Sequence, residues 1–104
     1  MITGVSNYPN PFDPREGPTT ITYCLAEDAP VTIIIYDLMG HLVQIFKVDA
    51  GANGGREGED NKVPWDGTNQ AGNLVARGGY LCRIMVEAEE GMFQCIRKIG
   101  VYSQ

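Results

Sequence analysis

The side chains able to act as nucleophiles are three cysteines, and a single histidine is available as their base. Cys24, Cys82 and Cys95 are spread along the chain, and His41 follows Gly40 in what the pattern predicts to be an exposed turn. Nucleophilic catalysis needs a base within hydrogen-bond distance of the nucleophile. A histidine in an exposed turn is not positioned next to a cysteine. No C-x-x-C pair is present, so a zinc site is not expected either. The simplest interpretation is that the thiols act as small, partly buried apolar side chains.

Pairs of carboxylates are the other source of chemistry. Glu89 and Glu90 stand next to Gly91 and are more simply explained as solubilising charges of a hairpin turn. Asp60 and Asp66 could form a hydrolytic pair, but Asp66 precedes Gly67 and is expected to accept bonds from its own backbone in an Asx-type turn. We therefore expect no enzyme and assign no catalytic residue.

A stretch rich in Asp and Asn side chains leaves calcium binding as a minor alternative. Carboxylate and amide oxygens are the donors that calcium takes, but their spacing here is not that of an EF-hand. The Gly51–Gly58 segment lacks the Gly-Lys-Ser/Thr element of a phosphate loop, so nucleotide binding is not expected. We expect no cofactor, while a calcium- or carbohydrate-binding accessory domain stays open. The possible calcium ligands are Asp60, Asn61, Asp66, Asn69 and Asn73.

Length, composition and charge limit the classes of protein to which the chain could belong. The chain has 104 residues, enough for one domain, and 43% of them are hydrophobic, enough for a core. The formal net charge of -5 argues against a nucleic-acid or anionic-membrane surface. No apolar run approaches the roughly 18 residues of a spanning helix, and the first ten residues do not look like a signal peptide. A large enzyme, a membrane-inserted protein and a nucleic-acid binder are therefore not expected.

Period-two alternation dominates the chain. Ile21, Tyr23 and Leu25 alternate with polar or small residues, which predicts a strand with one buried face. Residues 1–18 are predicted to be a loop-like, extended, proline-rich lead-in held to the core by Tyr8 and Phe12, and residues 49–62 a flexible, glycine-rich polar loop. The pattern predicts a single antiparallel β-sandwich over residues 1–104, of about seven strands. The strands are expected at residues 19–25, 31–37, 42–48, 63–65, 74–75, 78–87 and 92–102.

Two aromatic residues give further support to the predicted β-sandwich. Tyr80 follows a glycine pair and precedes Cys82 by two residues, as in the tyrosine corner of immunoglobulin-like sandwiches, and a backbone group is expected to bond its hydroxyl. Trp65 is expected to anchor the core between the sheets. Cys24 has the opposite parity to Ile21 and should point outward, so no disulfide is predicted.

One surface is predicted to be apolar. If Val31 and its period-two neighbours face inward, Ile34 and Tyr36 face the other way, and strand parity groups Phe46 with them. An exposed apolar patch of this kind often marks a partner site. The alternative is that the N-terminal segment or the long loop covers these side chains.

Several of these motifs together resemble one family. They are similar, in the same order, to motifs shared by the immunoglobulin-like domain of the flagellar hook-capping protein and by the C-terminal sorting domains of type IX secretion. The resemblance extends from Asn7 to about Val101. Its motifs are Tyr8-Pro9-Asn10-Pro11-Phe12-Asp13-Pro14, Thr20-Ile21-Thr22-Tyr23-Cys24-Leu25, Ile35-Tyr36-Asp37-Leu38-Met39-Gly40, Trp65-Asp66-Gly67-Thr68-Asn69-Gln70-Ala71-Gly72 and Gly79-Tyr80.

The resemblance implies a non-catalytic immunoglobulin-like module of a larger exported bacterial protein. Sorting and surface delivery is the leading expectation, with the rest of the parent polypeptide and an outer-membrane translocon as partners. The alternative is a structural assembly or protein-protein interaction domain, like that of the hook-capping protein. The module would pass from the periplasm to the cell surface or medium, and we expect a monomer.

Overall fold

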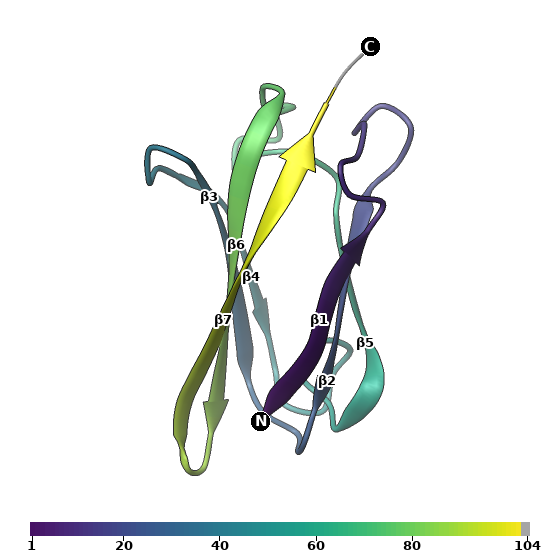
Figure 1. The fold of residues 1–104 in the computed structure, drawn as a ribbon. Coiled ribbons are helices and arrows are strands. Elements are labelled where there is room, and N and C mark those ends of the chain that lie inside the picture. Colours follow the sequence, from purple (N-terminus) through teal and green to yellow (C-terminus); the bar gives the residue numbers. More distant parts are fainter. Residues whose placement is uncertain (103–104) are drawn as a thin grey trace.

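The chain forms the strands of two facing sheets, as Figure 1 shows. Strands in which apolar and polar residues alternate bury one face and expose the other. The structure is a computed structural model that describes residues 1–102, and these residues contain no α-helix. The strands are β1 (Ile2–Tyr8), β2 (Thr19–Leu25), β3 (Val31–Asp37), β4 (Leu42–Val48), β5 (Gly58–Trp65), β6 (Gly78–Ala88) and β7 (Gly91–Val101).

The strands pair antiparallel in two layers. One sheet has the order β1-β2-β5 and the other the order β4-β3-β6-β7. The inward residues of β2, β3 and β6 are almost fully buried, which matches the alternation expected for them. The fold is therefore an immunoglobulin-like antiparallel β-sandwich.

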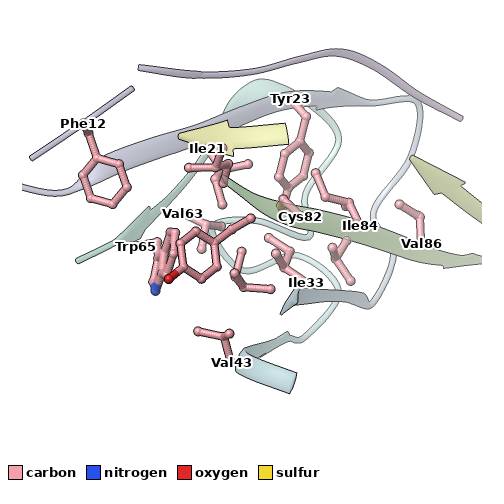
Figure 2. Packing of buried hydrophobic residues seen from close by; sticks show 14 of the residues in the cluster. Phe12, Ile21, Tyr23, Ile33, Val43, Val63, Trp65, Cys82, Ile84 and Val86 are labelled. Atoms are coloured by element: carbon pink, nitrogen blue, oxygen red, sulfur yellow. The ribbon is translucent and has the colours of Figure 1, made fainter. Parts of the chain in front are cut away.

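Trp65 lies at the centre of the core. Its side chain is 0% exposed, and its ring centroid lies 5.5 Å from that of Phe12 and 5.7 Å from that of Tyr80. Its Nε1 donates a 2.9 Å hydrogen bond to the carbonyl of Thr68. Figure 2 shows side chains from both sheets converging around this indole. The tryptophan therefore joins the sheets, as the sequence predicts.

The proline-rich lead-in is more ordered than a loop. Residues 2–8 form β1, which pairs with β2. The prediction missed this strand because its apolar residues do not alternate: a register irregularity between Thr3 and Ser6 breaks the period. Phe12 is buried as expected, whereas Tyr8 is 82% exposed and does not hold the segment to the core.

The polar stretch 49–62 is also not a simple exposed loop. Its last five residues belong to β5, while Gly54, Gly55 and Asn61 are buried. The Tyr23 hydroxyl donates a hydrogen bond to the carbonyl of Gly54. The segment is anchored by polar bonds to its backbone, which a count of apolar residues cannot reveal.

The turn after Trp65 has the expected form. Asp66 Oδ1 accepts bonds from the backbone N–H of Thr68 (3.1 Å) and from its hydroxyl (2.6 Å). Gly67 has φ +82°, and a Cβ there would lie 2.6 Å from a Pro14 ring carbon. The predicted strand 74–75 is absent: Leu74 forms only an isolated bridge with Thr68.

The tyrosine corner is present. The Tyr80 hydroxyl donates a 2.5 Å hydrogen bond to the carbonyl of Ala76, four residues earlier. Cys24 lies on the face of β2 opposite to the buried Ile21 and Tyr23, as its parity predicts. The structure therefore satisfies the Tyr80 hydroxyl locally and separates Cys24 from the core.

Candidate functional site

The outer face of the four-stranded sheet carries several apolar side chains that remain accessible, among them Leu42, Met92 and Ile96. Ile34 pairs across the sheet with Ile45 and Arg83, and Tyr36 pairs with Leu42 and Leu81. Residues paired across neighbouring strands point to the same side, so all of these side chains share the outer face. Ile34 and Tyr36 are each intermediate in burial.

Phe46 is not part of this face. It pairs with Ile33, which is fully buried, and it packs against the core. The register shifts between Ile35 and Tyr36, which leaves Val43 as an extra, buried residue in β4. A one-residue insertion reverses the parity beyond it, so the predicted grouping of Phe46 with Ile34 is wrong.

Neighbouring residues of β4 provide a test of this assignment. Phe46→Ser is expected to cost about 2–3 kcal/mol of unfolding free energy, because it removes packing from the core rim and leaves a hydroxyl there. Ile45→Ser, on the outer face, should cost less than about 1 kcal/mol. Urea denaturation of both variants measures the difference, and equal losses would contradict the inward orientation of Phe46.

A hollow of about 410 Å³ lies on the outer face. The β3–β4 turn borders one end, where Leu38 is 62% exposed, and β7 borders another side, where Ile96 is 52% exposed. Its floor and walls are therefore mostly apolar. The lining residues are Tyr36, Asp37, Leu38, Gly40, Leu81, Arg83, Gln94 and Ile96.

Polar groups at the hollow are held in place by neighbours. Arg83 Nε and a terminal nitrogen donate to Gln94 Oε1 at 2.9 and 2.7 Å. Asp37 accepts bonds from the backbone of His41 and Met39, and its carboxylate lies 3.1 Å from His41 Nδ1. These bonds, that from the His41 backbone above all, hold the pKa of Asp37 below its usual range. The arrangement suits binding of an apolar group beside a polar one.

Residues considered for chemistry have structural roles instead. Burial raises the pKa of the Cys82 thiol to about 12, which keeps it protonated and unreactive. Trp65 is fully buried and cannot stack on a sugar. His41 lies in the β3–β4 turn with a 75% exposed side chain.

Three of the five possible calcium ligands, Asn61, Asp66 and Asn69, bond backbone groups with their side chains, and the Asp60 carboxylate pairs with Arg56. Asn69 Oδ1 accepts from Ala71 and Asn73, and the Asn61 amide is bonded on all sides within the 49–62 segment. Among residues 1–102, no three His, Cys, Asp or Glu side chains gather as a metal site would require.

No helix in the same range is long and apolar enough to cross a membrane.

Of the eight residues that line the hollow, the predicted patch contains only Tyr36. Leu81 and Arg83 alternate with the buried Cys82 and Ile84, so the parity of β6 was sufficient to place them outward. Gln94 and Ile96 could be found only from the register of the β6–β7 hairpin.

The fold and its motifs have counterparts among known proteins. The family model described as FlgD Ig-like domain matches residues 10–91. The chain belongs to this family. The match to the FlgD Ig-like domain covers the core strands β2 to β6 and confirms the sequence-based resemblance.

Solved structures with a similar sandwich belong to larger proteins. Dimeric latent PorU from Porphyromonas gingivalis is 28% identical, with a TM-score of 0.75, over 96% of this chain and 9% of PorU. PorZ of the same organism, described as an essential bacterial surface component of the type IX secretion system, is 24% identical over 96% of this chain and 12% of PorZ, with a TM-score of 0.61.

FlgD from P. aeruginosa is 16% identical over 77% of this chain and 58% of FlgD, with a TM-score of 0.61. The chain thus spans less than two thirds of each of these three proteins. No curated protein sequence matches it.

Proposed function

We propose that this FlgD Ig-like domain is a non-catalytic module of a longer exported bacterial protein and directs the sorting and surface delivery of that protein. The observation that carries the proposal is the similarity to PorU, which extends over 96% of this chain but only 9% of PorU. The chain thus resembles one small part of a much longer polypeptide. The motifs shared with type IX sorting domains support the same role.

The mechanism would be recognition of a folded surface. Asn61, Asp66 and Asn69, considered as metal ligands, bond backbone groups of the 49–62 segment and of turns. The remaining surface features are a sheet face with an apolar hollow and the edge strands of two sheets. An export partner would therefore bind the sandwich as a rigid body, without chemistry at a pocket.

A transport assay tests this role. Residues 1–104 are fused behind a signal peptide and a fluorescent reporter in a bacterium that has type IX secretion. We expect the reporter at the surface or in the medium, and in the periplasm of a translocon mutant. The same reporter without the domain should remain periplasmic in both strains.

The outcome depends on the fold, so it needs a folding control. Protease resistance of the periplasmic pool reports whether the domain is folded. Folded domain that stays in the periplasm of the secreting strain would refute the sorting role.

The second candidate is structural assembly, and the family match itself favours it because the family is defined by FlgD. An assembly domain would act through contacts between proteins, for which the outer-face hollow is suited. Sedimentation of the isolated chain distinguishes the candidates: we expect a monomer for sorting, whereas self-association at micromolar concentration would favour assembly.

A further inference from the structure

The sheet edges differ in how their outward backbone groups are covered. On β4, the Val43 carbonyl accepts from the backbone of Gln70 (3.0 Å), and the N–H of Ile45 donates to the Gln44 side chain (3.1 Å). On β5, the Asn53 amide bonds both the N–H (2.9 Å) and the carbonyl (2.8 Å) of Lys62. Such cover hinders the addition of another strand.

The other sheet edges contain further interruptions. Pro64 removes a donor from β5, and Gly4 lies within the irregular register of β1 with φ +63°. Proline and bulges are common devices that protect sheet edges.

The edge of β7 is covered at one end only. The pair Ala88 and Gly91 closes a two-residue turn, so odd-numbered residues of β7 bond β6 and even-numbered ones direct their N–H and carbonyl groups away. The Asn10 side chain bonds the N–H of Gly100 (2.9 Å) and the carbonyl of Lys98 (3.1 Å). The Gly100 carbonyl accepts from the N–H of Phe12 at 2.9 Å.

The other end of the same edge is open. Within the described chain, the outward N–H and carbonyl groups of Met92 and Gln94 and the N–H of Ile96 have no partner. The Ile96 carbonyl accepts only from the exposed guanidinium of Arg97, at 2.9 Å. We define residues 92–96 as the open edge.

Apolar side chains lie on both sides of the open edge. Met92 and Ile96 are 61% and 52% exposed on the outer face. On the inner side, Phe93 is only partly buried, as are Ile2 and Val5 of β1, the strand that lies closest to β7 in the other sheet. A strand added here would cover apolar surface with both of its faces.

The charge beside the open edge selects the partner. Arg83, Arg97 and Lys98 have no carboxylate partner among residues 1–102, where the ion pairs use Arg15, His41 and Arg56. Arg83 and Lys98 share the outer face of the sheet, whereas Arg97 pairs with the inward-facing Cys82 and lies on the other side of β7, in a chain of net charge -5. Cations without carboxylate partners attract an acidic segment.

We propose that the open edge of β7 binds an extended acidic segment of another polypeptide as an added β-strand. Apolar side chains of this segment pack against Met92, Phe93 and Ile96, and its carboxylates lie near Arg97 and Lys98. This interaction site does not depend on the export route, because it concerns binding by the isolated domain.

A designed peptide tests the proposal. The probe is a blocked ten-residue peptide that alternates valine and threonine and carries two glutamates at one end. In an NMR titration of the full chain, we expect the amide signals of Met92, Gln94 and Ile96 to shift and their hydrogen exchange to slow. A counterpart with lysines in place of the glutamates should bind at least about tenfold more weakly.

A matched pair of variants isolates the backbone contribution. Gln94→Pro removes an outward N–H without removing a bond to β6, and Gln94→Ala removes the same side chain but keeps the N–H. We expect at least about tenfold weaker binding by the proline variant than by the alanine variant. Equal affinities would overturn the proposal.

Two further comparisons use the unchanged chain, so misfolding of a variant cannot affect them. A peptide methylated on four consecutive backbone nitrogens should not bind, and equal binding would refute strand addition. If the same amide signals instead shift with protein concentration alone, the occupant is a second copy and the proposal is wrong. Equal binding of the lysine peptide would refute the acidic preference.

Discussion

Trp65→Ala is expected to lower the free energy of unfolding by about 3–5 kcal/mol. The indole is fully buried between Phe12 and Tyr80, so its removal leaves a large cavity where the sheets meet. The carbonyl of Thr68 also loses the donor that bonds it. Small domains have a total stability of about 5–15 kcal/mol, so the variant would be close to unfolding at 37 °C.

Urea denaturation followed by far-UV circular dichroism measures the effect, since the substitution removes the fluorescent group. Trp65→Phe is the matched control: it keeps an aromatic ring but loses the hydrogen bond and part of the volume. We expect about half the loss for this variant. A loss below about 1.5 kcal/mol for Trp65→Ala would show that the indole does not join the sheets.

Asn61→Leu is expected to cost about 3 kcal/mol, although leucine has a similar volume. The Asn61 Oδ1 accepts from the N–H groups of Gly54 (3.0 Å) and Arg56 (3.2 Å), and its Nδ2 donates to the carbonyls of Arg56 (2.8 Å) and Gly58 (3.2 Å). The residue is 0% exposed. Leucine would leave these backbone groups without partners and with little access to water.

Asn53 provides the comparison for this experiment. Its side chain also bonds backbone groups of the 49–62 segment, but at the surface. Asn53→Ala should therefore cost less than about 1 kcal/mol, because water replaces the lost bonds. Hydrogen exchange should accelerate at the amides of Gly54 and Arg56 in Asn61→Leu only. Similar losses for both variants would contradict a central role for Asn61.

The strands with one fully buried face could be predicted from the sequence. Ile21, Tyr23 and Leu25 alternate without interruption, and the structure buries all three. The same holds for Val31, Ile33 and Ile35. Alternation is informative here because every second side chain of these strands enters the core.

The features that could not be predicted depend on distant parts of the chain. The extra residue in β4 reverses the orientation of Phe46, and nothing near Val43 in the sequence signals it. β1 became visible only through its pairing with β2, because its own residues lack alternation. The role of Asn61 follows from backbone groups that fold around it, and an asparagine in a polar stretch looks like a surface residue.

The same limit applies to the candidate site. Ile34 and Tyr36 could be placed outward from the alternation of one strand, whereas the hollow also needs Gln94 and Ile96 from β7. The open edge of β7 ends where the Asn10 side chain bonds the backbone of Lys98 and Gly100. Its extent therefore depends on the three-dimensional position of residue 10, which the sequence does not reveal.

The bonds between the Asn10–Phe12 segment and the end of β7 have a mechanical consequence. Phe12 pairs with Val101 in parallel, and β1 begins toward one end of the molecule while β7 ends toward the other (Figure 1). Tension between those ends acts along the strands, so it loads these bonds together in shear instead of opening them one at a time. If the domain transmits a pulling force to the polypeptide it belongs to, this junction is where the load is first shared.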